Sequence, residues 1–126
     1  MNKHNIFWIV VLMMIATNSW SYGSSSSSKA CAKPKFSEYL PVENSEVAVG
    51  SNFSFNASAN THPNSIKVAV KGLPVKVTVK LKNAGNYEVS GVIPGELNDT
   101  FARISIDAEA DSSCNGGGGW LIKITK

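Results

Sequence analysis

The sequence has few of the side chains that bind metals or carry redox chemistry. Of its 126 residues, three are Met and two are His. Every Met, and one His (His4), lies within residues 1–14. The remainder holds no Met, a single His (His62) and two Cys (Cys31 and Cys114). This inventory excludes most zinc, copper and haem sites, because those sites need several His, Cys or Met ligands. The sequence also lacks a CxxC pair, a nucleophile-elbow motif and EF-hand spacing, so we expect no catalytic residue, no metal and no cofactor.

Long hydrophobic runs are also scarce, since only Ile6–Ala16 is continuously apolar. Lys3 precedes this run and the polar segment Thr17–Ser21 follows it, which is the order found in a secretory signal peptide. A helix of that length spans about 16 Å, which is too short for the ~30 Å hydrocarbon core of a membrane. We therefore expect residues 1–21 to be a cleaved signal peptide, the mature protein to be secreted or periplasmic, and no stable membrane insertion to remain after cleavage.

The residues after the predicted signal peptide divide into a spacer and one domain. Residues 22–30 are rich in Ser and have no apolar face, so we expect a disordered spacer there. Residues 31–126 carry the apolar periodicity and have the size of a single domain. Because exported proteins meet an oxidising compartment, Cys31 and Cys114 are expected to form one disulfide. Closing that loop would stabilise the fold by roughly 4–4.5 kcal/mol in the chain-entropy model, and any strain in the folded state is subtracted from this value.

Short segments in which apolar and polar residues alternate fill the domain and predict β-strands. The predicted strands are Lys35–Leu40, Glu46–Val49, Asn52–Ala59, Ser65–Val70, Val75–Leu81, Asn86–Ile93, Thr100–Ala108 and Gly119–Thr125. At Gly91 we expect a β-bulge that shifts the register. No stretch keeps apolar residues at helical spacing over three turns. The pattern predicts an all-β chain that folds as an antiparallel β-sandwich of seven to eight strands.

Three segments resemble bacterial immunoglobulin-like, or fibronectin-III-like, modules. Pro41–Phe55 resembles their opening, with a Pro, a turn, a Val, a Gly and an aromatic strand. Ser65–Gly72 is similar to the strand that follows, and Ala108–Asp111 with Asn115-Gly116 resembles their closing turn. The resemblance implies an immunoglobulin-like β-sandwich. Such modules commonly serve as spacers, adhesion domains or ligand-binding units in exported proteins.

Lysines alternate with apolar residues along two neighbouring predicted strands. If the apolar residues of Ser65–Val70 and Val75–Leu81 face the core, the lysines face outward together. The expected lysine-rich sheet face comprises Lys67, Lys71, Lys76, Lys80 and Lys82. This face would bind an anionic polysaccharide, a lipid headgroup or an acidic protein, or it would simply keep an exposed sheet soluble and block edge-to-edge pairing. The second interpretation is favoured, because the net charge is only +3, or +2 without Lys3, and no aromatic residue lies between the lysines. The same features disfavour nucleic acid as a partner.

Consecutive glycines precede the last tryptophan of the chain. The candidate ligand loop comprises Asn115, Gly116, Gly117, Gly118, Gly119 and Trp120. In that interpretation, bare backbone would contact a ligand beside an aromatic platform. The alternative is a disulfide-tethered hairpin loop with Trp120 in the core, and it is favoured because Trp120 has the same parity as Ile122 and Ile124.

These features together predict an exported, non-catalytic binding or assembly protein of the cell envelope with a protein or glycan partner. One alternative is an adhesion or anionic-polysaccharide-binding module that uses the lysine-rich sheet face. The third is a small periplasmic enzyme or metal carrier. For that chemistry the sequence offers His62, which lies in a turn before Pro63, together with Asp107 or Asp111.

Overall fold

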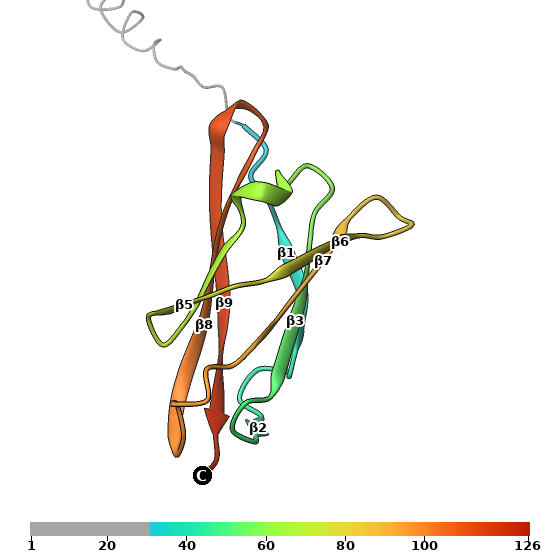
Figure 1. Cartoon of the computed structure of the whole chain (residues 1–126). Helices are drawn as coiled ribbons and strands as arrows, with labels where there is room; N and C mark the ends of the chain where they lie inside the picture. Colours follow the sequence, from blue (N-terminus) through green and yellow to red (C-terminus); the bar gives the residue numbers. More distant parts are fainter. Residues whose placement is uncertain (1–30) are drawn as a thin grey trace, which may run out of the picture. The chain divides into compact units, whose positions relative to one another are not determined.

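The computed structural model describes residues 31–126, which form two facing β-sheets (Figure 1). The predicted signal peptide (residues 1–21) and spacer (residues 22–30) lie outside the described residues. Helix within the described range is confined to two single-turn 3₁₀ segments, η1 at Pro63–Ser65 and η2 at Asp111–Ser113. No helix in this range is long and apolar enough to cross a membrane.

One sheet has four strands in the order β1-β3-β7-β6, and the other has five in the order β2-β9-β8-β4-β5. The strands are β1 Phe36–Leu40, β2 Glu46–Val47, β3 Asn52–Ala57, β4 Lys67–Val70, β5 Leu73–Val75, β6 Thr78–Leu81, β7 Tyr87–Val92, β8 Thr100–Ala110 and β9 Cys114–Ile124. Neighbouring strands are antiparallel, except that β2 runs parallel to β9. The predicted all-β sandwich is confirmed, but residues 31–126 form nine strands where seven to eight antiparallel strands were expected, and β2 is parallel to its neighbour.

The core lies between the sheets, and Trp120 of β9 is its largest fully buried side chain. The indole stacks on Tyr39 with 4.5 Å between ring centroids, and it meets Phe53 and Phe55 edge-on at 6.4 and 6.2 Å. Its Nε1–H donates to the carbonyl oxygen of Pro41 at 2.6 Å, so the polar atom of the ring is paired. The parity of Trp120 therefore predicted its burial correctly.

The segment Val75–Leu81, predicted as one strand, is two strands in different sheets. β5 pairs with β4 in the five-stranded sheet, whereas β6 pairs with β7 in the four-stranded sheet, and Figure 1 shows the chain crossing between them. Alternation survives the crossing because inward side chains of both sheets meet one core, so Val75, Val77 and Val79 all pack against it. Leu81 does not, since it lies where β6 enters a protruding hairpin, and it is 64% exposed.

The predicted bulge at Gly91 is wrong. β7 pairs with β3 in unbroken register from Val92, opposite Asn52, to Tyr87, opposite Ala57. Glycine is required at position 91 for space, because a Cβ there would lie 2.6 Å from Cζ of Phe53. The same Cβ would lie 3.2 Å from the carbonyl oxygen of Lys76, in the crossing segment. Gly91 therefore lets both the Phe53 ring and the crossing pack against β7.

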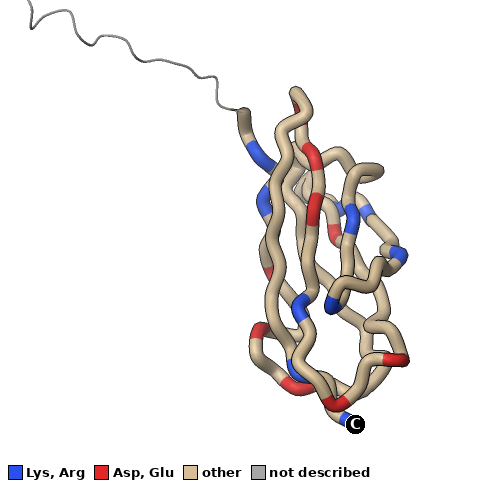
Figure 2. Tube along the Cα trace, turned by 90° about the vertical axis from the view of Figure 1, so that its left-hand side faces the viewer, with Lys and Arg blue, Asp and Glu red and all other residues tan. Residues whose placement is uncertain are grey.

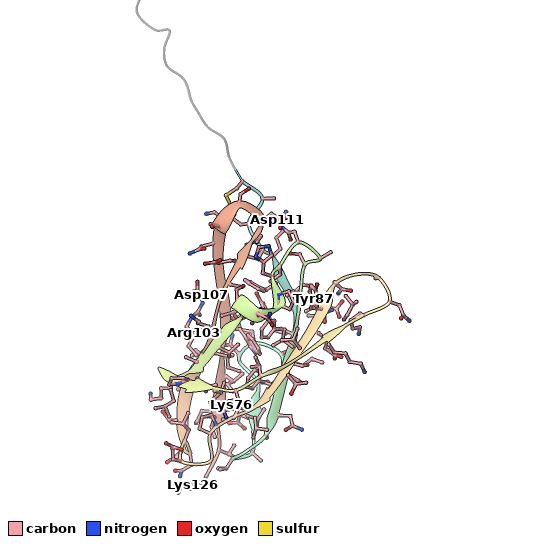
Figure 3. The ribbon with its side chains drawn as sticks, turned by 45° about the horizontal axis from the view of Figure 1, so that its top comes forward. Lys76, Tyr87, Arg103, Asp107, Asp111 and Lys126 are labelled. Atoms are coloured by element: carbon pink, nitrogen blue, oxygen red, sulfur yellow. A yellow bond between two sulfur atoms is a disulfide. The ribbon has the colours of Figure 1, made fainter. Side chains whose placement is uncertain are left out.

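The predicted disulfide between Cys31 and Cys114 is present, with 5.8 Å between the two Cα atoms and a sequence separation of 83. It joins the segment before β1 to the first residue of β9. Figure 3 shows the bond at the same end of the domain as Asp111. Such a bridge fits the predicted secreted or periplasmic localisation, because disulfides persist in oxidising compartments.

Candidate binding surfaces

The predicted lysine-rich sheet face is not a single surface. Lys67 lies on β4 and Lys71 directly follows it, in the five-stranded sheet. Lys80 lies on β6 and Lys82 directly follows it, in the four-stranded sheet, while Lys76 lies in the crossing. The prediction failed because it treated the crossing as a continuous strand. Figure 2 accordingly shows basic and acidic positions interspersed along the domain.

Two of these lysines face acidic residues on the adjacent strand. Lys67 lies directly opposite Asp107 on β8, and Lys80 lies opposite Glu88 on β7. The neighbouring carboxylates reduce the positive potential around Lys67 and Lys80.

The predicted glycine loop is a β-strand. β9 begins at Cys114, and Asn115–Gly119 pair residue by residue with Ser105–Glu109 of β8. The loop that joins β8 to β9 is reduced to η2. Glycine has a low β-propensity, so the sequence pattern indicated a loop, and the ladder with β8 overrides that preference.

The glycines are needed because the N-terminal segment packs directly on them. A Cβ at Gly116 would lie 3.0 Å from Cδ of Pro34, and one at Gly118 would lie 3.0 Å from the ring of Phe36. Gly119 has φ +152°, and a Cβ there would lie 2.3 Å from the carbonyl oxygen of Ile104. Since Trp120 is fully buried, the glycines and the indole do not form an exposed ligand loop.

An open groove of about 970 Å³ lies at the end of the four-stranded sheet where β3 begins and β7 ends. A row of residues in register crosses all four strands there: Leu40 of β1, Ser54 of β3, Ser90 of β7 and Thr78 of β6. Val92 lies further along β7, and both Leu40 and Val92 are more than half exposed, at 55% and 54%. The groove thus combines hydroxyl groups with accessible aliphatic side chains.

Sequence analysis did not identify this groove. Alternation indicates that Ser54, Thr78 and Ser90 face outward, but their alignment depends on strand register and on the sheet order. The sequence signal was the outward parity of these three polar residues within strands in which apolar and polar residues alternate.

His62 contacts one of the predicted carboxylates. Its Nε2 lies 2.8 Å from Oδ1 of Asp111, with the two side chains 48% and 84% exposed. Residues 31–126 contain no group of three or more His, Cys, Asp or Glu that could hold a metal ion. One imidazole and one carboxylate are too few for a zinc or copper site built from this chain alone, which takes three or four ligands.

Comparison with known proteins identifies a shared fold. No protein-family model matches the sequence, and no curated protein matches it significantly. Among solved structures, CopC from Methylosinus trichosporium OB3b is similar, with 12% identity and a TM-score of 0.55 over 73% of this chain and 93% of CopC. PcoC, a methionine-rich copper resistance protein from Escherichia coli, aligns with 17% identity and a TM-score of 0.49 over 75% of this chain and 100% of PcoC. The likeness to CopC concerns the β-sandwich and not its ligands.

Proposed function

We propose that this protein is an exported, non-catalytic binding or assembly module of the cell envelope, and that a partner protein docks in the groove of the four-stranded sheet. The observation that carries this proposal is the presence of more than half-exposed Leu40 and Val92 beside a row of hydroxyl groups. Protein interfaces commonly have this composition, with an apolar centre and polar groups that hydrogen-bond at the rim.

The distribution of exposed apolar side chains supports a docking role for this end of the domain. Two of the six exposed large apolar residues in the described chain, Leu40 and Val92, line the groove, and Val42 directly follows Pro41, which also lines it. Single exposed apolar residues need no explanation, but a cluster of them marks an interaction site.

The groove chemistry favours a protein over a glycan. Phe53, the aromatic residue that lines the groove, is only 1% exposed. A sugar ring would therefore find no accessible aromatic face to stack on. The hydroxyls of Ser54 and Ser90 and the aliphatic chains of Leu40 and Val92 match the mixed composition of a protein surface.

Site-specific photocrosslinking in intact cells tests the proposal. We expect a photoreactive amino acid at Ser90 to give a discrete protein adduct, and Val92→Arg to abolish that adduct without altering the circular dichroism spectrum. The matched control places the same photoreactive group at Ser105, which is exposed on the five-stranded sheet. No adduct at Ser90, or the same adduct at Ser105, would contradict the proposal.

A second candidate function is metal carriage, which the contact between His62 and Asp111 favours. Because the chain offers two donors there, the cargo ion would need further ligands from outside the domain. Calorimetric titration with Cu²⁺ tests this candidate, since a carrier should lose at least about tenfold in affinity on His62→Ala. Absence of Cu²⁺ binding by the unmodified protein would eliminate it.

A further inference from the structure

A sheet edge exposes unpaired N–H and C=O groups, and proteins usually block such edges against pairing with other chains. Three edges of this sandwich carry a block. β5 is three residues long and contains Pro74, and β6 contains Lys80. β1 has a register shift between Ser37 and Leu40, with Glu38 at φ 51°.

The edge of β9 is different. β2 covers this strand only at Lys123 and Ile124. Between Asn115 and Gly119, β9 has β8 on one side and no strand on the other within residues 31–126. This stretch contains no Pro, no Lys and no register shift.

The direction of the free backbone groups follows from the bonds further along β9. The N–H of Asn44 donates to the carbonyl oxygen of Leu121, and the N–H of Lys123 donates to the carbonyl oxygen of Ser45. Odd-numbered residues of β9 therefore direct their backbone groups away from β8, because these directions alternate along a strand. Asn115, Gly117 and Gly119 thus present their N–H and C=O groups to the open side, and Asn115 and Gly117 are exposed.

We propose that Asn115–Gly119 is a docking edge to which a partner polypeptide adds an extended strand with apolar side chains at alternate positions. Main-chain hydrogen bonds provide the affinity in such strand addition, and side chains at alternate positions provide the selectivity. None of the residues Asn115–Gly119 lines the proposed groove, which is formed mainly by the four-stranded sheet. The inference is therefore independent of the proposed function.

The glycines favour a foreign strand over a second copy of this chain. Inward side chains of an added strand would lie beside Gly116 and Gly118, on the side where Phe36 and Tyr39 are only partly buried. Apolar side chains of the partner would cover the parts of Phe36 and Tyr39 that remain exposed. A second copy of the same edge would bring Gly116 and Gly118 to the inward positions. These residues have no side chains that could cover the rings of Phe36 and Tyr39.

Gly117 offers a matched pair of variants for the test. Its N–H faces the open edge, so Gly117→Pro removes an edge donor without removing a hydrogen bond to β8. Gly117→Ala keeps that donor, and both variants place a Cβ about 3.3 Å from the carbonyl oxygen of Ile106. If Gly117→Pro does not fold, Asn115→Pro removes the neighbouring edge donor.

The probe is a short synthetic peptide of alternating valine and threonine with a lysine at each end. It is added at about millimolar concentration to the protein without its predicted signal peptide. Amide hydrogen exchange, followed by NMR, should slow at least about tenfold at Asn115 and Gly119 in the unmodified protein and in Gly117→Ala. The proline variant should show no change. Val92→Arg should retain the protection, which separates this edge from the groove.

Two kinds of result would overturn the inference. One is the absence of protection at Asn115 and Gly119 in the unmodified protein, or equal protection in the proline variant. The other is a dimer in sedimentation experiments without peptide that Gly117→Pro dissociates, since this would assign the edge to a second copy of the chain.

Discussion

The two halves of β9 share one continuous ladder with β8, yet they stabilise the sandwich in opposite ways. Trp120, Ile122 and Ile124 are fully buried and fill the core with their own side chains. Gly116–Gly119 contribute no side chains, and Gly116 and Gly118 leave room for Pro34 and β1 to lie against the backbone. The comparison shows that a strand with low intrinsic β-propensity persists when its neighbours supply the packing.

The halves also differ at their outer edge. We call Trp120–Ile124 the apolar half of β9 and Asn115–Gly119 the glycine half. Beside the apolar half, β2 and the segment before it pair with Leu121, Lys123 and Ile124. Beside the glycine half, the edge from Asn115 to Gly119 is open. The variants below change the apolar half, the covalent tether at the start of the glycine half, and then single glycines, in order of decreasing expected effect.

Trp120→Ala removes the centre of the apolar half. We expect a loss of about 3–5 kcal/mol in the free energy of unfolding, because the substitution creates a cavity among Tyr39, Phe53 and Phe55. Urea denaturation followed by far-UV circular dichroism measures the change. A loss below about 1 kcal/mol would show that the indole does not anchor this half.

Replacing both Cys31 and Cys114 by Ser removes the tether where the glycine half begins. We expect a loss of about 2–4 kcal/mol, because the bridge restricts a long loop in the unfolded chain. Thermal unfolding of the double variant, compared with the oxidised parent, measures this effect. An unchanged Tm would mean that packing alone holds the N-terminal segment on the glycines.

Gly119→Ala tests whether the glycine half requires glycine conformation. The cost should be about 1–3 kcal/mol, because the residue has φ +152° and the new Cβ would lie 2.3 Å from the carbonyl oxygen of Ile104. Urea denaturation provides the measurement. Stability equal to that of the parent would refute the close approach of β8 at this position.

Gly117→Ala is the matched control within the same half and should have the smallest effect, below about 1 kcal/mol. Its Cβ would point outward and meet only the carbonyl oxygen of Ile106, at 3.3 Å, where a slight adjustment suffices. The difference between the Gly119 and Gly117 variants, measured under identical conditions, isolates the strain at Gly119. Equal losses would contradict this distinction.

Several structural features followed from the sequence because they depend on local chemistry. Alternation predicted most of the strands and the inward parity of Trp120, since successive side chains on a strand point to opposite faces. Cysteine count and predicted export identified the disulfide. The candidate groove was not predictable in this way, because Ser54, Ser90 and Thr78 are far apart in sequence and only the register aligns them.

The sequence by itself determined the all-β class, most of the apolar core positions and the covalent link between Cys31 and Cys114. The tertiary structure alone decided which sheet each strand joins, and so it separated Lys67 from Lys80 and placed the glycines in a strand. The physical reason is that inward alternation looks the same on either sheet, since both sheets face one core. Strand partners and open edges are set by long-range hydrogen bonding and packing, which leave no periodic signal in the local sequence.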